Sequence, residues 1–229
     1  MPSSPALFDV EQFRTEKRRI AVVREVNRPT LVLGSTQSTE FVDAIAIRER
    51  TVDLERRRGG GGAVYLGPGE QLWLDVWIPR DDPLWVVDVS AAGEWVGAWW
   101  MEALAALGQR GFEVHRGRSV PGESGDLVCF AGRGPGEVFQ GDRKVVGLSQ
   151  WRAREGALFS SCAYLHWDPA QLVALIDLGE DARADLTRRL ALMAAGLADL
   201  EPPVGDLTPV RAALLHSFPA FTVAGPPVP

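Results

Sequence analysis

Two segments that lie far apart in the chain constrain its fold more than any other feature. The first, residues 56–65, reads RRRGGGGAVY, so a basic run enters a glycine loop and then returns at once to apolar residues. The second, residues 141–150, reads GDRKVVGLSQ and places Lys144 at the start of an apolar, β-branched run. Glycine permits close approach of the backbone, so several N–H groups of such a loop can converge on one anion. A chain with both segments is predicted to bring the loop and Lys144 together around one acidic group.

Each segment alone also has a simpler interpretation. The glycines can form a flexible surface loop beside a solvated basic run, although a linker seldom returns at once to an apolar run such as 63–65. Lys144 can be a solvent-facing position of a strand that is apolar on its other face. The loop is not a P-loop, because no Gly-Lys-Ser/Thr follows it, and no long helix pattern opens after it as in a dinucleotide-binding fingerprint.

The composition is that of one large globular domain, or of one domain with a small appendage. The chain has 229 residues, of which 46% are hydrophobic and 24% charged, as in ordinary soluble proteins. A net charge of −6 and a pI near 5.2 argue against general nucleic-acid binding, which needs a basic face. No apolar run approaches the length of a membrane span, and the N-terminus lacks the pattern of a signal peptide. We expect a cytoplasmic protein without nucleic-acid or membrane partners.

The cysteines and histidines give no sign of a disulfide framework or a metal centre. Two cysteines are too few to staple a chain of this length, which favours a reducing compartment. The histidines, His115, His166 and His216, are scattered without the spacing of metal ligands. We therefore expect no metal site built from protein side chains.

Strand and helix patterns are mixed along the chain. Residues 71–78 alternate in character, which predicts a half-buried strand ending at Pro79. Residues 91–109 have a broad apolar face, which predicts a helix that ends at Gly108. Further strands are expected at 19–26, 30–34, 51–56, 137–140, 143–151 and 157–167, with two short ones within 112–130. Further helices are expected at 8–18, 39–47, 169–177, 181–199 and 208–217. Asp9 is the expected cap of the first of these helices, and Asp168-Pro169 begins the third. A β-rich body with inserted and appended helices is an α+β arrangement.

At the two opening segments the chain resembles the catalytic domain shared by lipoate–protein ligases, octanoyltransferases and biotin–protein ligases. The lipoyl branch reads Arg-Arg-x-Ser/Thr-Gly-Gly-x-Ala-Val and later Gly-x-Lys-Val/Ile-x-Gly-x-Ala/Ser-Gln, which residues 56–64 and 141–150 resemble. The early Gly-x-x-Gln of the family is matched by Gly34 to Gln37. The resemblance implies a mixed β-sheet domain like that of class II synthetases and biotin ligases.

The resemblance also implies a domain organisation. We expect an N-terminal tail with the first helix and strand over residues 1–27, and the ligase-like catalytic domain over 28–178. Helices over 179–229 are expected to pack on the same domain, with a loose tail from about residue 224.

The implied reaction attaches a lipoyl or octanoyl group to a lysine of a lipoyl carrier domain, either in a 2-oxoacid dehydrogenase or in the H protein of glycine cleavage. The first interpretation is a ligase, which forms an acyl-adenylate from ATP with Mg²⁺ and then the amide. The alternative is an octanoyltransferase or amidotransferase that works through a thioester on Cys129. It needs neither ATP nor Mg²⁺ and takes octanoyl from acyl carrier protein or moves it between carriers. A non-catalytic binder of lipoate or of a carrier domain is a further alternative. It is motivated by Leu66, Ser160 and Ser161, which stand where family members carry polar histidines.

The site residues follow from the same resemblance. The loop is expected to hold the acyl carboxylate or adenylate phosphate, and the strand lysine to stabilise charge on the acyl carbonyl. The implied substrate-binding residues are Arg57, Gly60, Gly61, Gly62 and Gly147, and the implied catalytic residues are Lys144 and Cys129.

Cys129 has two interpretations that the sequence leaves open. One branch of the family carries Cys-Phe-x-x-Pro-Ser-x-Tyr-Glu before the lysine motif, and the distance from Cys129 to Lys144 matches that branch. There the cysteine takes the acyl group as a thioester, and a thiolate near Lys144 and Arg133 suits this role. Alternatively, Cys129 is a small buried residue at the end of a strand. Cys162 lies inside a predicted core strand and is expected to be structural.

Overall fold

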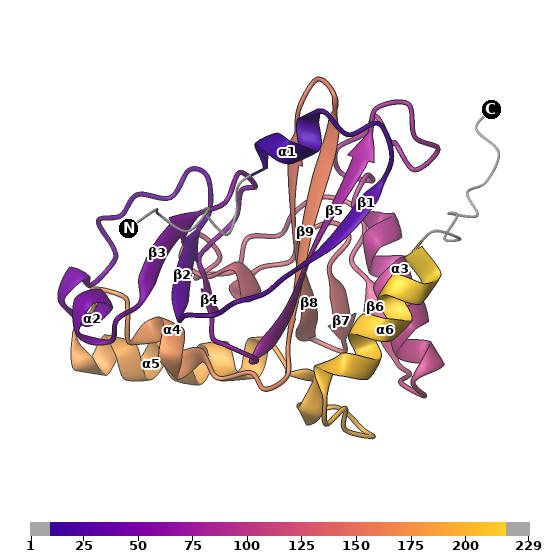
Figure 1. The fold of residues 1–229 in the computed structure, drawn as a ribbon. Coiled ribbons are helices and arrows are strands. Elements are labelled where there is room, and N and C mark those ends of the chain that lie inside the picture. The colour runs from indigo at the N-terminus through magenta and orange to yellow at the C-terminus, as the bar shows by residue number, and fades with distance from the viewer. Residues whose placement is uncertain (1–9, 219–229) are drawn as a thin grey trace.

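The computed structural model describes residues 10–218, in which two sheets pack together between two groups of helices (Figure 1). The larger sheet is antiparallel, with six strands in the order β1-β5-β9-β8-β7-β6. The smaller has the order β3-β2-β4, with β2 parallel to β3 and antiparallel to β4. The strands are β1 Ile20–Arg24, β2 Thr30–Leu33, β3 Asp53–Arg56, β4 Val64–Leu66, β5 Gln71–Pro79, β6 Phe112–Val114, β7 Val138–Gln140, β8 Arg143–Arg152 and β9 Gly156–Tyr164. The predicted α+β class is confirmed.

The helices cover the two outer sides of the paired sheets. The pair α3 and α6 packs on the larger sheet, and α4 and α5 pack with the smaller one. The helices are α1 Glu11–Arg14, α2 Ala44–Glu49, α3 Glu94–Ala106, α4 Pro169–Val173, α5 Glu180–Met193 and α6 Leu207–Ser217, with short 3₁₀ turns η1 Cys129–Ala131 and η2 Leu197–Asp199. None of the helices described between residues 10 and 218 is long and apolar enough to cross a membrane.

Tryptophans of α3 join the helix layer to the larger sheet. Trp100 is fully buried and donates its indole N–H to the hydroxyl of Ser161 on β9, at 3.0 Å. Trp99 donates to the carbonyl of Leu214 at 3.2 Å, which fixes the C-terminal helix α6 against α3. Each indole thus buries a large apolar surface while its single donor finds a partner.

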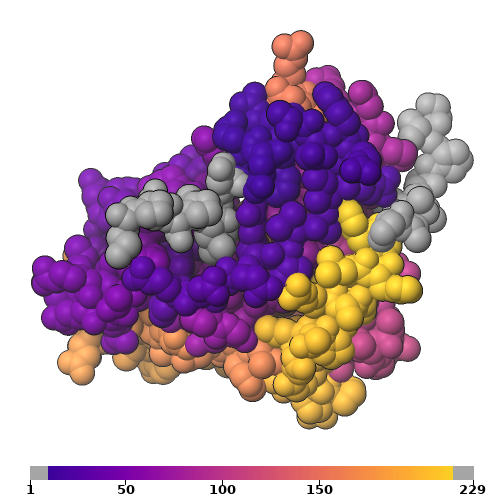
Figure 2. Space-filling view, in the orientation of Figure 1, coloured from indigo at the N-terminus to yellow at the C-terminus, as the bar shows by residue number. Residues whose placement is uncertain are grey.

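Strand β5 differs from its predicted half-buried character, because all nine of its residues are buried. Its second face is covered by the N-terminal segment at Trp77 and by the smaller sheet at Trp73, which the alternation within the strand itself does not indicate. Phe13 of α1 stacks on Trp77 with ring centroids 6.3 Å apart, and β1 pairs along the strand. Figure 2 shows this N-terminal part of the chain lying across the front of the molecule.

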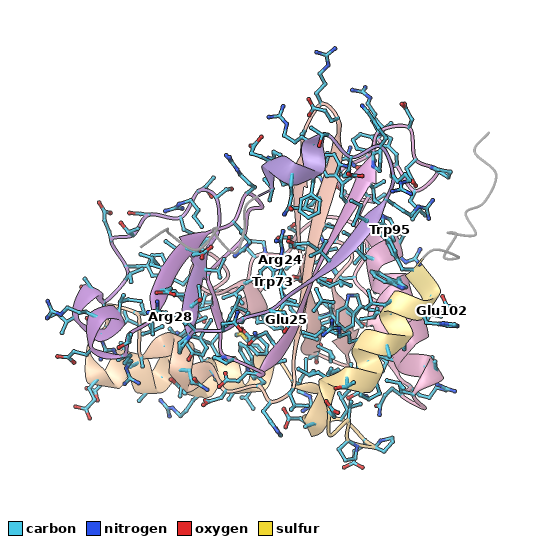
Figure 3. The ribbon with its side chains drawn as sticks, viewed as in Figure 1. Arg24, Glu25, Arg28, Trp73, Trp95 and Glu102 are labelled. Carbon is cyan, nitrogen blue, oxygen red and sulfur yellow. The ribbon has the colours of Figure 1, made fainter. Side chains whose placement is uncertain are left out.

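A buried polar network lies where β1, β5 and β9 meet. Asp75 is fully buried and accepts hydrogen bonds from Arg24 Nε at 2.7 Å, Trp73 Nε1 at 2.9 Å and Ser160 Oγ at 2.6 Å. Figure 3 shows Arg24 and Trp73 close together in the middle of the molecule. A buried carboxylate is tolerated only with such partners, so the network fixes how these strands lie.

Three other predicted elements differ from the structure. Only one strand, β6, forms within residues 112–130, and the second is replaced by the turn η1. The predicted helix at 181–199 ends at Met193, because the chain then extends and Ala195 N–H donates to the carbonyl of Lys144 at 3.0 Å. The first helix is shorter than predicted and has no side-chain cap. Its predicted cap, Asp9, and the predicted loose tail from about residue 224 lie outside the described residues.

Removing the carboxylate at the centre of the network tests its role in stability. The Asp75→Asn variant leaves the Arg24 guanidinium buried without a counter-charge, and we expect unfolding to become easier by about 3–5 kcal/mol. Asp185→Asn is the control, because its ion pairs with Arg188 and Arg189 are largely exposed and should be worth about 0–1 kcal/mol. Urea denaturation measures both, and equal losses would contradict the role given to Asp75.

Candidate active site

The glycine loop is paired directly with the segment that carries Cys129. Ala63 donates its N–H to the carbonyl of Leu127 at 2.7 Å, and its carbonyl accepts the N–H of Cys129 at 3.0 Å. Gly62 lies so close to this segment that a Cβ there would sit 2.5 Å from the carbonyl carbon of Val128. The absence of a side chain therefore permits the contact that places the loop beside the thiol.

The early Gly-x-x-Gln motif ties a third segment to the same place. Gln37 accepts the N–H of Gly34 at 2.9 Å, and its amide donates to the carbonyl of Leu127 at 3.2 Å. Arg56 donates to the carbonyls of Gly34 and Gln37 at 2.8 and 2.6 Å. The end of β2 therefore supports the glycine loop from one side.

Arg57 lies behind the loop and not in front of it. Its guanidinium is 2% exposed and donates to the carbonyls of Gly60 and Gly62, each at 2.8 Å. Burial lowers the pKa of this guanidinium, but an arginine starts so high that it keeps its charge. The resemblance implies that Arg57 binds the substrate, whereas in the structure its hydrogen bonds hold the glycine loop in its conformation.

The loop leaves backbone donors free on its other side. Gly61 has φ +94°, a left-handed conformation that favours glycine. Within residues 10–218, no acceptor takes a hydrogen bond from the N–H groups of Gly60, Gly61 or Gly62. These amides can therefore serve a negatively charged oxygen of a bound molecule.

Lys144 is buried at the edge of the same cavity. Its side chain is 1% exposed, which excludes the solvent-facing alternative. Its ammonium group lies 2.7 Å from Oε2 of Glu137 and donates to the carbonyl of Cys129 at 2.7 Å. The hydrogen bond to Cys129 therefore places the ammonium group beside the residue that carries the thiol.

Cys129 does not lie at the end of a strand, because it begins the turn η1. It is half-buried and Cys162 is buried, and both are free thiols. Burial raises the pKa of the Cys162 thiol far above its ordinary value, which makes that residue inert. The structure therefore distinguishes a cysteine at a cavity from a structural one.

These groups line a cavity of about 520 Å³. Its basic side chains are Arg133 and Lys144, and its carboxylates are Asp126 and Glu137. Its other lining residues that matter here are Gly60, Gly61, Gly62, Cys129, Leu148, Ser149 and Gln150. The cavity is large enough for a small acyl substrate of the size that pockets usually bind.

Gly147 does not face this cavity. A Cβ at Gly147 would lie 3.0 Å from the ring of Phe130, so the close approach there is made by a side chain of the protein. Gly147 lines a void of about 10 Å³, together with Arg57 and Cys129. Gly147 is implied by the resemblance as a substrate-binding residue, whereas in the structure the ring of Phe130 occupies the space next to it.

Glu137 is the site residue that the sequence reasoning missed. It is 3% exposed and pairs with Lys144 inside the cavity wall. The signal was present, because the cysteine branch of the family ends its motif in a glutamate at the same distance from the cysteine as Glu137 from Cys129.

Adding a methyl group to the loop tests the close contact at Gly62. In Gly62→Ala the new Cβ meets the backbone of residues 128–129, which cannot rotate away, so we expect a loss of about 1–3 kcal/mol of stability. Gly60→Ala is the matched control, because no atom lies within 4 Å of its Cβ position and a change within about 0.5 kcal/mol is expected. Thermal unfolding compares the two, and equal stability would contradict the contact.

Alkylation tests the difference between the two thiols. In the native protein at about pH 8 we expect iodoacetamide to modify Cys129, whereas Cys162 stays protonated because burial raises its pKa. Peptide mass spectrometry measures each site, and unfolding in denaturant should make both reactive. Equal labelling of the two cysteines in the native state would refute the assignment.

A family model and solved structures of similar fold both relate this chain to lipoate–protein ligases. The family described as the lipoyl protein ligase A/B catalytic domain matches residues 9–218. A bipartite lipoate–protein ligase from Thermoplasma acidophilum has a similar fold, with a TM-score of 0.67 and 21% identity over 88% of this chain and 70% of that one. A lipoate–protein ligase A bound with ATP also has a similar fold. Its TM-score is 0.64 and its sequence identity is 22%, over 88% of this chain and 72% of that one.

Comparison with curated proteins gives no sequence match. The likeness to the solved structures shows the fold, and the family match extends over nearly all of the described residues. The chain therefore belongs to the lipoyl protein ligase A/B catalytic domain family, and it is an enzyme of the ligase or transferase type.

Proposed function

We propose that the protein transfers a lipoyl or octanoyl group to a specific lysine of a lipoyl carrier domain through a thioester on Cys129. One observation carries this proposal: the thiol of Cys129, the ammonium group of Lys144 and the unpaired loop amides share one cavity. An acyl transfer needs such a set, namely a nucleophile, a cation and N–H donors for the carbonyl oxygen.

In the first step, the thiolate of Cys129 attacks the acyl carbon of a donor thioester. The negative charge that develops on the carbonyl oxygen is stabilised by the loop amides and by Lys144. The donor sulfur leaves with the electrons of the broken C–S bond and takes up the proton that the Cys129 thiol lost on becoming a thiolate. The amine of the carrier lysine then attacks the Cys129 thioester, an amide forms, and the Cys129 sulfur leaves and takes up the proton that the amine loses.

The partners follow from this chemistry. The acceptor is a lipoyl domain of a 2-oxoacid dehydrogenase or the H protein of glycine cleavage, and the donor is an acyl carrier protein. The archaeal ligase of similar fold was studied together with its E2 lipoyl domain, which supports this class of acceptor.

A second candidate is an ATP-dependent lipoate ligase that forms an acyl-adenylate. The unpaired loop amides favour it, because they also suit a phosphate oxygen, and so does the ATP-bound ligase of similar fold. Among residues 10–218, no group of three or more His, Cys, Asp or Glu side chains is arranged to hold a metal ion. In this route Mg²⁺ would enter with the nucleotide phosphates.

The side chains that line the cavity supply no excess of positive charge for a nucleotide, and the one further cation, Arg57, lies behind the loop with its donors on the carbonyls of Gly60 and Gly62. The two basic side chains that line the cavity are balanced by Asp126 and Glu137. A nucleoside triphosphate carries several negative charges and binds best where the local field is positive. An acyl thioester is neutral at the reacting group and makes no such demand.

The test supplies the full-length protein with an apo lipoyl domain and either octanoyl acyl carrier protein or lipoate with ATP and Mg²⁺. We expect the mass of the lipoyl domain to increase from the octanoyl donor without ATP. Cys129→Ala should lower this rate by at least about a thousandfold, and Lys144→Met by about a hundredfold or more. Cys162→Ala is the matched control and should retain the transfer.

The other outcomes identify the alternatives. Modification that requires ATP and survives Cys129→Ala would replace the thioester route with the ligase. No modification from either donor, together with binding of lipoate or of the carrier domain, would overturn the enzymatic proposal in favour of a non-catalytic binder.

A further inference from the structure

A buried ion pair lies in the wall of the cavity, next to the proposed nucleophile. The side chains of Lys144 and Glu137 are 1% and 3% exposed, and their charged atoms are 2.7 Å apart. A buried ion pair is weak evidence for a stabilising role, because apolar residues of similar size often stabilise a core as well or better. The position of the pair at the cavity points to a role in the chemistry.

The carboxylate of Glu137 is fixed from both sides by the backbone. Its Oε2 accepts the N–H of Gly134 at 2.6 Å, and its Oε1 accepts the N–H of Leu148 at 3.4 Å. Gly134 lies before β7 and Leu148 lies on β8, and both line the cavity. Glu137 is therefore tied to two segments, which restricts where its carboxylate and the ammonium group that it holds can lie.

The ammonium group of Lys144 has one N–H to spare. An ammonium group donates three hydrogen bonds, and among the described residues its only acceptors are Glu137 and the carbonyl of Cys129. The rings of Phe130 and Phe139 lie 5.6 and 5.9 Å from Nζ, a distance at which an aromatic face attracts a cation. Since Lys144 lines the cavity, the third N–H is available to a substrate oxygen.

Burial acts against the charge on both partners, so each depends on the other. A buried lysine without a counter-charge shifts towards its neutral form. For Glu137, burial raises the pKa of the carboxyl, and Lys144 and the two backbone N–H groups oppose that effect. An ammonium group that must stay charged in this site therefore needs the carboxylate of Glu137.

We propose that Glu137 is a positioning residue for acyl transfer, which holds Lys144 protonated and directed at the acyl oxygen beside Cys129. This rests on the proposed function and deepens it. Lys144 then acts as a fixed cation that stabilises the oxyanion, and it does not serve as the base that removes a proton from the thiol or from the carrier amine.

The first test measures octanoyl transfer by the full-length protein and its variants. Glu137→Gln should lower kcat by about a hundredfold, with KM for the carrier domain changed by less than about threefold. Glu25→Gln is the matched control, because it removes an exposed carboxylate that is paired to Arg211 outside the cavity, and it should leave kcat unchanged. A Glu137→Gln enzyme with wild-type kcat would overturn the proposal.

The second test observes the ammonium group itself by ¹H–¹⁵N NMR, without any substrate. We expect a slowly exchanging Lys144 signal in the wild type, assigned by its loss in Lys144→Met, and absent in Glu137→Gln. Glu137→Asp keeps the negative charge but moves the carboxylate away from Lys144, because the side chain is one methylene shorter. The Lys144 signal should therefore persist while kcat falls about tenfold. This variant still tests the proposal if Glu137→Gln does not fold.

The two measurements separate the failure of this inference from that of the proposed function. If the wild type transfers no acyl group, the proposed function fails, whereas the NMR signal still reports whether Glu137 holds the charge on Lys144. If the wild type transfers normally but the signal survives in Glu137→Gln, the positioning role is refuted and the function stands.

Discussion

The pair of backbone hydrogen bonds between Ala63 and residues 127 and 129 is the interaction on which the site depends. It brings the end of the glycine loop to the thiol-bearing turn. The carbonyl of Cys129, fixed by that pairing, then accepts the ammonium group of Lys144 from β8. Three segments that are distant in the chain are thus connected through one residue, so a shift of the loop would be transmitted to the lysine.

The two buried cations of the site, Arg57 and Lys144, have different hydrogen-bond partners, which explains their different roles. Arg57 is surrounded by carbonyl oxygens and has no described carboxylate partner within hydrogen-bond distance. A guanidinium tolerates this, because it is weakly hydrated and presents several donors in a fixed plane. The ammonium group of Lys144 is compact and strongly hydrated in water, so its burial calls for Glu137. The arginine therefore shapes the loop, whereas the lysine faces the cavity.

Much of the fold was predictable where local chemistry decides it. Asp168 caps a helix whose first residue is Pro169, and a glycine with φ +84° follows α3 at residue 108, both as the sequence predicts. The meeting of the glycine loop with Lys144 was predictable from the family pattern. What was missed depends on distant segments. The second face of β5 is buried by Phe13 at Trp77 and by the smaller sheet at Trp73, which no periodicity within the strand can report.

The site residues fall into two groups, namely those that serve both candidate reactions and one that serves only the thioester route. A loop amide stabilises any negatively charged oxygen, whether it belongs to a tetrahedral intermediate or to a phosphate, so the glycine loop serves a transferase and a ligase equally well. Lys144 is equally general as a cation. The thiol of Cys129 is different, because only a covalent route requires it. The choice between the two reactions therefore depends on one sulfur atom at the cavity.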